Sequence, residues 1–586
     1  MDKDIQLSKL NKKNIEEQLE SWFLDGTSWD KTWRDNAKLW YDYYHGRHWT
    51  SDEVSALEER GQAVTTYNHI KPAIDSIIGS ERQNRPKTTM AGRTGDDERL
   101  AEAKTKLYEY IQYNSNTDDE IDRMLLDAMV TGRGFINIYP ETVDNKIDIK
   151  HTWVDYRDMF IDGLSKNDDL SDCRYIHYAV YTDEDIIKQQ FSSYKTNDSS
   201  TESPFGFDSS SDDEIWYQNT DRKRPRLINT WFKDEEGNLA TVIWVKGQVL
   251  YFKKQPYTSN DFPFVQLTLD RDLDNMPYGK VKVMTSAQDE VNKRHSKALH
   301  YLNAKQVLAE EDAFVSWEEA KKTLAKPDGV TKLVDGALAQ GKIQIIDNTA
   351  LAATHIEMMK IARDNILFLV GLNPASLGQA GQYESAKKTN MSIAMAQSSI
   401  VPMLNKIRIA RWRLAKITMK LIPDFYTDER VIRIIQPNGN YAFMPMNKVD
   451  ILDDGTMVRF NDMTNDDVDV VIEDAPRGLN EREEQFAQLL QIQGQTSRPI
   501  PMEILLRYSS IKEKHQLASD LEGYYKLEAQ LQQAQQIIEQ LQGQVQQLSG
   551  QVQQQQSQLV QTQTARAVDK EVSKVKEKLN AQLGNL

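Results

Sequence analysis

The sequence predicts an α+β protein built from several substructures, and three observations support this. Its 586 residues exceed what one hydrophobic core holds, because domains usually span roughly 100–200 residues. Segments with helical periodicity are joined by short β-branched and aromatic runs such as FINIYP and YIHYAVY. Residues 527–586 form a glutamine-rich stretch with a repeating apolar seam. We therefore expect a mixed α/β body and a separate helical tail.

Composition limits the class of protein. With 72 basic and 88 acidic residues the net charge is −16, which argues against a protein that grips nucleic acid over its whole surface. The single cysteine, Cys173, can form neither an intramolecular disulfide nor a cysteine zinc cluster, so a reducing compartment is expected. The start lacks the apolar core of a signal peptide, and no apolar run approaches the ~18 residues of a membrane span. We expect no membrane association.

Residues 1–279 are expected to form a first α+β region. Up to about residue 116 the pattern is helical, and the spacing of Trp29, Trp33 and Trp40 places the three rings on one helix face, which predicts core positions. Short strands follow over residues 134–181. After a polar, acidic loop at 196–214 the strands resume, and we expect them to form a sheet that ends near Asp270.

A helix, an insert and a second helix are expected next. Apolar spacings of three, four and seven predict a helix over 280–306, on which Lys282, Lys293 and Lys297 fall within about 60° of one another. Residues 307–353 predict a compact α/β insert, in which Ser316 and Glu319 have the spacing of a capping box. The returning helix is expected over 354–372.

Residues 373–385 predict a loop because they include Pro374, Gly378 and Gly381. A long helix should begin near Glu384, and residues 385–421 hold eight lysines and arginines and no acid, a local charge of +8. Pro402 removes a backbone donor and should kink this helix. Strands are expected to follow up to residue 479, and helices over 480–526.

The C-terminal tail combines low complexity with a heptad seam. Glutamine fills 18 of the 36 positions from 528 to 563. The apolar positions alternate spacings of four and three, which favours parallel association of helices. The seam residues are Leu527, Leu531, Ala534, Ile538, Leu541, Val545, Leu548 and Val552. A featureless tail is the alternative, because Gly543 and Gly550 weaken a helix.

One motif imitates a nucleotide site. Gly336, Gly341 and Lys342 have the GxxxxGK spacing of a phosphate-binding loop, and VVIED at 470–474 imitates its acidic strand. Position 343, however, is Ile rather than Ser or Thr, and the IQII that follows predicts a strand where phosphate binding needs a helix N-terminus. No zinc-binding histidine pattern and no serine nucleophile motif occurs. We therefore expect no catalytic residues, no metal and no cofactor.

Four segments together give the sequence a family resemblance. They are LWYDYYHGRHW, NHIKPAIDSIIGSERQNRP at 68–86, VTGRGFINIY at 130–139 and MPYGKVKVMTSAQDEVNKRHSKAL at 276–299. In this order, and with the succession of helix, insert, helix, loop and long helix, the chain resembles the portal proteins of tailed bacteriophages, most closely those of short-tailed phages. The resemblance covers roughly residues 29–478, and within the last segment Pro277, Tyr278, Gly279, Gln288, Asn292 and Ser296 match.

The resemblance implies a portal-type architecture and a role. Residues 280–306 and 354–372 would be stem helices, 307–353 the clip, 373–385 the tunnel loop, and 1–279 with 386–479 the wing. A helical crown at 480–526 and a barrel-like extension at 527–586 would follow. Members form rings, typically dodecamers, at one capsid vertex, through which double-stranded DNA is packaged and ejected. Implied partners are the terminase large subunit, head-completion or tail adaptor proteins, and the capsid and scaffolding proteins, with assembly in the host cytoplasm and residence in the virion.

The resemblance also suggests functional residues. The tunnel or DNA-facing candidates are Lys282, Lys293, Lys297, Gly378, Gly381, Ser385, Lys387 and Lys388. The alternative is that these lysines form salt bridges with acidic residues. An exposed aromatic ring with an acidic rim suits a transient interface. The candidates for docking at the clip are Glu310, Glu311, Asp312, Trp317, Glu318 and Glu319, although Trp317 could instead be core of the insert.

Two other classes of protein stay open at this point. A packaging ATPase would explain the GxxxxGK spacing together with DNA association. A coiled-coil scaffold or structural virion protein would explain the C-terminal seam alone, and deletion of residues after Leu527 should then destroy all assembly.

Overall fold

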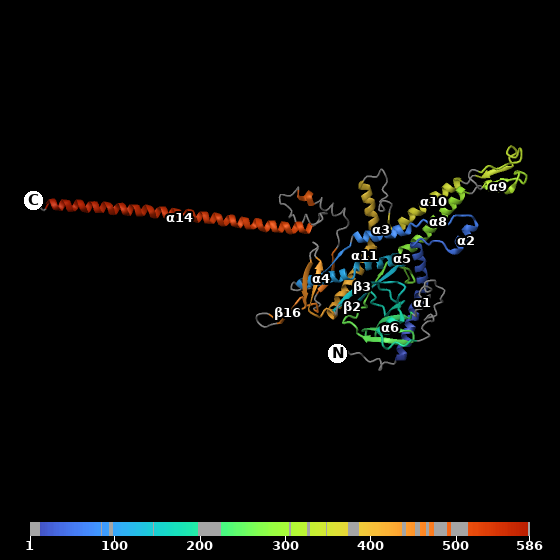
Figure 1. Cartoon of the computed structure of the whole chain (residues 1–586), viewed down its shortest axis with the longest axis horizontal. Coiled ribbons are helices and arrows are strands. Elements are labelled where there is room, and N and C mark those ends of the chain that lie inside the picture. Colours follow the sequence, from blue (N-terminus) through green and yellow to red (C-terminus); the bar gives the residue numbers. More distant parts are fainter. Residues whose placement is uncertain are drawn as a thin grey trace. The chain divides into compact units, whose positions relative to one another are not determined.

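The computed structural model describes residues 12–83, 85–92, 98–143, 146–196, 224–303, 306–324, 329–346, 349–372, 386–435, 441–451, 457–464, 468–473, 489–493 and 514–583. The chain falls into two compact units, Met1–Ile434 with Tyr441–Pro476, and Ile435–Asn440 with Arg477–Leu586. Helices and antiparallel strands share the first unit, so the predicted α+β class is confirmed (Figure 1).

Five helices open the first unit and carry much of its core. They are α1 (Lys12–Tyr44), α2 (Ser51–Glu59), α3 (Ile70–Gln83), α4 (Glu98–Asn114) and α5 (Thr117–Thr131). Along α5 most side chains are buried, because α1, α3 and the following strands enclose it. On α1, Trp33 and Trp40 are buried as predicted, but Trp29 is 39% exposed. The core prediction is therefore wrong for Trp29, whose ring lies against Gly163 at the surface.

Two antiparallel sheets follow. The first has the order β3-β2-β9 and the second the order β4-β5-β6-β7-β8. Their strands are β2 (Arg133–Val143), β3 (Lys146–Val154), β4 (Met159–Ile161), β5 (Tyr175–Tyr181), β6 (Arg226–Lys233), β7 (Leu239–Val245), β8 (Gln248–Lys254) and β9 (Phe264–Thr268). The helix α6 (Glu184–Gln190) follows β5. The sequence predicted one sheet for the later strands, and this is wrong for β9, which pairs with β2. All five residues of β9 are buried. Such burial is expected beside β2 in the body of the protein and would not be expected at an open sheet edge beside β8.

A helix pair with a knob at its end extends from this body. The hairpin of β10 (Asp270–Arg271) and β11 (Pro277–Tyr278) leads into α8 (Lys280–Asn303), and α10 (Thr349–Leu369) returns beside it (Figure 1). Between the helices, β12 (Gln306–Ala309) pairs with β13 (Ile343–Ile346), and α9 (Trp317–Leu324) packs on this hairpin. The first helix ends three residues earlier than expected because Gln306 belongs to β12, and the second begins five residues earlier, at Thr349.

The long helix α11 (Ala386–Phe425) continues through Pro402. The strands after it form short antiparallel pairs, β14 with β15, β16 with β17, and β1 with β18. Their bounds are β1 (Lys87–Gly92), β14 (Arg430–Ile435), β15 (Tyr441–Met446), β16 (Lys448–Ile451), β17 (Met457–Phe460) and β18 (Val468–Glu473). Because β1 and β18 are almost 400 residues apart in the sequence, this pairing ties the start of the first unit to its end.

The second unit contains α14 (Lys514–Leu583), a single helix of 70 residues. It begins 13 residues before the expected tail, inside the span predicted for the crown, of which residues 489–493 are also helical. The tail is therefore helical rather than featureless, since leucine, alanine and glutamine favour helix enough to carry two glycines. The seam residues Leu527, Leu531, Ile538, Leu541, Val545, Leu548 and Val552 are all exposed.

A buried carboxyl group between α1 and α5 gives the first unit a pH-dependent stability. Tyr41 donates a hydrogen bond to Asp127, and Trp153 Nε1 donates another at 2.8 Å. Burial nevertheless raises the pKa of Asp127 from 3.8 to about 8. Between these values the folded protein holds a proton that the unfolded chain has lost, so stability should fall as the pH rises.

We expect the melting temperature to decrease from pH 7 to pH 9, above the range in which the histidines titrate, and the Asp127→Asn variant to show a flatter dependence. The melting temperatures are measured by thermal unfolding at several pH values across this range. Asp119→Asn, at an exposed position of the same helix, is the control and should leave the wild-type slope unchanged. A constant difference between the wild type and Asp127→Asn at every pH would contradict the assignment.

Candidate functional site

The helix pair is held together by one apolar face on each helix. The buried positions are Val281, Met284, Val291 and Ala298 on α8, and Ala352, Ala362, Ile366 and Val370 on α10 and just after it. The small alanines let the two helices approach closely along their length. The body fixes one end of the pair, and the knob joins the two helices at the other.

Two polar side chains of α8 bind the backbone of residues 67–69, just before α3, to the helix pair. Gln288 and Asn292 lie four residues apart and are both buried. Gln288 Oε1 accepts from the backbone of His69 at 2.9 Å, and Asn292 Oδ1 accepts from the backbone of Tyr67 at 3.1 Å. Asn292 Nδ2 also contacts His48 Nδ1 at 2.8 Å. Gln288 and Asn292 therefore hold α8 against this segment of the same chain.

The lysine stripe of α8 is exposed, and two of its members have acidic partners. Lys282 lies 3.7 Å from Asp272, and Lys293 lies 3.3 Å from Glu53. Lys297 is exposed near Arg294 and His355. Burial, with the positive charges of Arg294 and Lys297, lowers the pKa of His355. The positive charge of the stripe is thus least compensated at its knob-proximal end.

Several basic side chains of α11 form ion pairs and hydrogen bonds within the first unit. Arg411 binds Glu81 and Asp118, each at 2.9 Å, and Lys420 pairs with Asp261. Arg413 donates to the backbone oxygen of Asp168 at 2.7 Å. These contacts hold the helix against the body.

The remaining tunnel candidates fall wholly or partly outside the described residues. Lys387 and Lys388 have backbones in the first turn of α11, and their side chains lie outside the described residues. Gly378, Gly381 and Ser385 lie outside the described residues altogether.

The knob presents the predicted acidic surface. Glu310, Glu311, Asp312, Glu318 and Glu319 are all exposed. Trp317 is 42% exposed, its Nε1 donates to the backbone of Glu311 at 3.0 Å, and its ring meets Phe314 edge-on at 4.9 Å. Trp317 thus supports the knob and remains accessible. The sequence analysis missed the exposed apolar residues of the knob, because apolar residues in a small insert are expected in its core. They are Leu308, Val315, Val330, Val334, Leu338 and Ile345.

The GxxxxGK segment has a structural role. Lys342 pairs with Asp312 and lies 4.0 Å from Glu310, so its charge fastens the knob. The strand β13 begins directly after it, as predicted, and supplies no helix N-terminus for a phosphate.

An exposed apolar stripe on α10 has no partner in the part of the chain that the structure describes. Its members are exposed by 39–80% and lie at spacings of seven, three, seven and one. They are Leu351, Met358, Ile361, Phe368 and Leu369. On a 3.6-residue helix this stripe borders the face packed on α8, so the apolar surface of α10 extends well beyond that contact. The sequence analysis missed it, although its seven-residue spacing was a visible signal.

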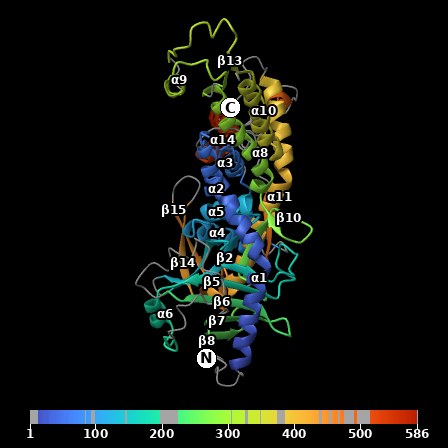
Figure 2. The ribbon, with the colours of Figure 1, turned by 90° about the vertical axis from the view of Figure 1, so that its right-hand side faces the viewer.

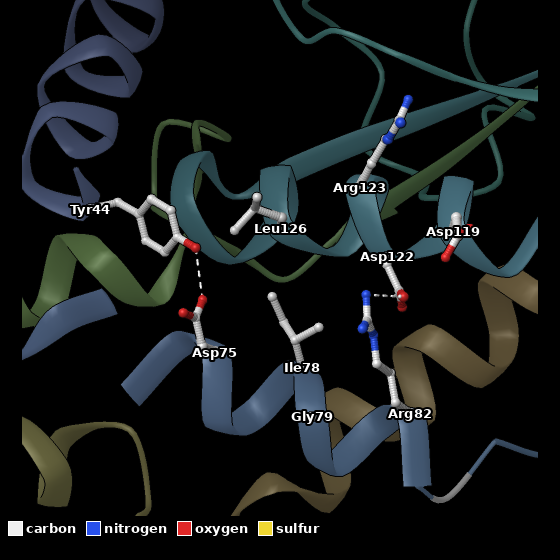
Figure 3. Close-up of a pocket in the computed structure, with 9 residues that line it drawn as sticks. All are labelled: Tyr44, Asp75, Ile78, Gly79, Arg82, Asp119, Asp122, Arg123 and Leu126. Carbon is white, nitrogen blue, oxygen red and sulfur yellow. Dashed lines mark hydrogen bonds and ion pairs between the residues drawn. The ribbon is translucent and has the colours of Figure 1, made fainter. Parts of the chain in front are cut away.

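An open pocket of about 500 Å³ lies between α3 and α5 (Figure 3). Ile78 and Leu126 face each other across its middle. At one end Tyr44 donates to Asp75 at 2.7 Å, and at the other Arg82 pairs with Asp122 at 2.7 Å. No sequence pattern indicates this pocket, since its residues come from three helices that only the fold brings together.

The described segments hold neither a metal site nor a membrane span. No cluster of histidine, cysteine or acidic side chains among their residues has the arrangement that binds a metal ion. No helix among them combines the length and apolar character needed to cross a membrane.

Comparison with known proteins identifies the family. The model of the phage P22-like portal protein family matches residues 20–582. A portal protein of Helicobacter pylori bacteriophage KHP30 is 21% identical over 420 residues, which cover 70% of this chain and 66%, just under two thirds, of the relative.

Solved structures with a similar chain come from a native gene transfer agent virion and from the neck of an empty gene transfer agent particle computed with C6 symmetry. Both are 8% identical. The TM-scores are 0.35 and 0.36, with 76% and 79% of this chain and 94% of each of those chains covered. The family match over nearly the whole sequence places the chain in the P22-like phage portal protein family.

Proposed function

We propose that this protein forms a ring, with about twelve copies, at one vertex of a phage capsid, and that double-stranded DNA is packaged and ejected through its central channel. Family membership carries the proposal. The exposed apolar stripe of α10 supports it, because a monomer gains nothing from an apolar surface that stays exposed on a helix.

The elements suit the parts of such a ring. In this proposal α8 and α10 are the stem, the knob of β12, α9 and β13 is the clip, and the sheets with α11 form the wing. Residues 373–385 would be the tunnel loop, 480–526 the crown, and α14 would join its copies through the heptad seam in a barrel. The ring would be assembled in the host cytoplasm and remain in the virion.

The clip is the proposed docking site. We assign to it the terminase large subunit during packaging and the head-completion or tail adaptor proteins afterwards. The exposed acids, Trp317 and the exposed apolar residues of the knob fit partners that exchange, because an aromatic anchor with a charged rim gives specificity without a large buried area. Capsid and scaffolding proteins would contact the outside of the ring.

Negative-stain electron microscopy of the purified full-length chain tests the proposal. Annular particles with a central hole and near twelvefold symmetry are expected. A population that stays monomeric at micromolar concentration would contradict it.

The charges of the stem predict which lysine contacts DNA. Lys282 and Lys293 have acidic partners, so Lys297 should contribute most to the attraction of the phosphate backbone. We expect rings of Lys297→Glu to bind duplex DNA more weakly. The slope of log affinity against log salt should fall by about 1 for each phosphate group that the variant no longer neutralises.

Fluorescence anisotropy of labelled duplex DNA at several salt concentrations measures this slope. Lys321→Glu, an exposed residue of α9, is the control for the change in net charge. An equal weakening by both variants would show that only total charge matters.

A further inference from the structure

The hairpin of β10 and β11 presents one apolar side chain at its tip. Leu273 is fully exposed. Asp272 Oδ1 accepts the backbone N–H groups of Asp274 and Met276 at 3.1 and 2.9 Å, and Asn275 Nδ2 donates to the backbone of Ser165 at 3.0 Å. The tip is therefore braced both internally and from a neighbouring loop. In Figure 2 the hairpin projects beyond α11. A rigid, protruding tip loses little entropy when it binds a partner.

The pocket between α3 and α5 has room for such a side chain. Its middle is apolar, with Ile78 and Leu126, and Gly79 lines it beside them (Figure 3). A Cβ at Gly79 would meet no atom within 4 Å. Glycine in a helix interior is less favourable than alanine, and neither a positive φ nor a close neighbour requires it here. The missing side chain keeps the pocket open.

The hairpin tip and the pocket also offer side chains of opposite charge. On the hairpin, Asp270 and Asp272 have lysine partners, whereas Asp274 forms no ion pair with any residue whose placement is described. Beside the pocket, the side chain of Arg123 points away from α3 (Figure 3), is 61% exposed, and forms a long ion pair with Glu120, at 3.7 Å.

Three acids also line the pocket, of which Asp75 pairs with Lys71 and Asp122 with Arg82. Asp119 lies in the first turn of α5, where the positive end of the helix dipole offsets its charge.

We propose that the hairpin tip of one copy docks in the α3–α5 pocket of the next copy, with Leu273 above Gly79 and Asp274 against Arg123. The inference rests on the proposed ring and names one of its contacts. Because two different surfaces meet, the contact is heterologous and can close into a ring. The base of the hairpin packs on the C-terminal end of α5, whereas the pocket is lined by residues 119–126 nearer the start of that helix, so the tip and the pocket are separate surfaces of one copy.

A disulfide between copies tests the contact. The full-length double variant Leu273→Cys with Gly79→Cys, assembled and then oxidised, should give a ladder of cross-linked oligomers on a non-reducing gel. The native Cys173 is buried and should not contribute. The controls are each single variant and Leu273→Cys with Tyr113→Cys, which places the second thiol at an exposed site on α4, and none should give the ladder.

The outcomes separate this contact from ring formation itself. Intact rings in electron micrographs without a ladder would overturn the contact and leave the proposed function standing, whereas a wild-type chain that never forms rings would overturn both.

A charge exchange gives a second readout that needs no cysteine. Arg123→Glu and Asp274→Arg should each weaken assembly about tenfold or more, and the double variant should recover most of the loss. Additive losses in the double variant would overturn the pairing of these two residues.

Discussion

An aspartate in place of Ile361 should abolish ring assembly and leave a folded monomer. Ile361 lies in the middle of the exposed apolar stripe of α10, and it is not one of the buried residues that pack on α8. If the stripe is buried between copies, the carboxylate must lose its water there without a partner, at a cost of several kcal/mol. Because about 1.4 kcal/mol changes an equilibrium tenfold, the association constant should fall at least about a thousandfold.

Analytical ultracentrifugation and electron microscopy measure this loss, and circular dichroism checks the fold. Ala353→Asp places the same charge on an exposed position of α10 outside the stripe and should assemble normally. Rings of normal abundance from Ile361→Asp would mean that the stripe faces solvent in the assembly, and the ring contact would have to lie elsewhere.

Replacement of Arg411 by methionine should destabilise the first unit more than any surface substitution. The side chain of Arg411 is only 6% exposed and bridges Glu81 of α3 and Asp118 of α5. Arg82 and Arg85 complete this network through Asp122, and Arg85 also contacts Glu81 and Asp118. Without the guanidinium, the carboxylate of Glu81 stays buried with less compensation. Breaking a buried ion pair from one side costs about 3–5 kcal/mol.

Chemical denaturation of the full chain, followed by tryptophan fluorescence, measures the loss as a lower midpoint. Lys416→Met is the matched control, since Lys416 is an exposed residue of the same helix whose ammonium lies 4.6 Å from the centre of the Trp412 ring. It should change the stability by less than about 1 kcal/mol. An equally small effect of Arg411→Met would show that the acids are hydrated and that the network contributes little.

The basic helix illustrates which features a sequence can reveal. The acid-free run from Lys387 to Lys420 is visible in the sequence, and it is helical as expected. Only Lys387 and Lys388 at its start were DNA-facing candidates, and further along the helix Arg411 and Lys420 bind acids that lie far away in the sequence. Spacing along one helix gives the face on which a charge lies, but the partner of that charge depends on which distant segment packs there.

The helix pair shows the same division. The apolar spacing of α8 predicted its length to within a few residues, because a helix repeats every 3.6 residues and needs one continuous buried face. The same rule predicted Trp29 to be a core residue. In the structure its ring lies at the surface beside Gly163. Periodicity identifies which face of a helix is buried. It does not show at which residue the neighbouring elements stop covering that face.

The sequence by itself determined the α+β class, the order of helix, knob and helix, the strand after the GxxxxGK segment and the helical tail. Each depends on local periodicity, on turn residues or on helix propensity, which neighbouring residues fix. The tertiary structure alone decided the pairing of β1 with β18, the place of β9 beside β2, the pocket at Gly79 and the apolar stripe of α10 as an exposed surface. Those features join residues that are far apart in the sequence, and their contacts are chosen by packing of the whole chain.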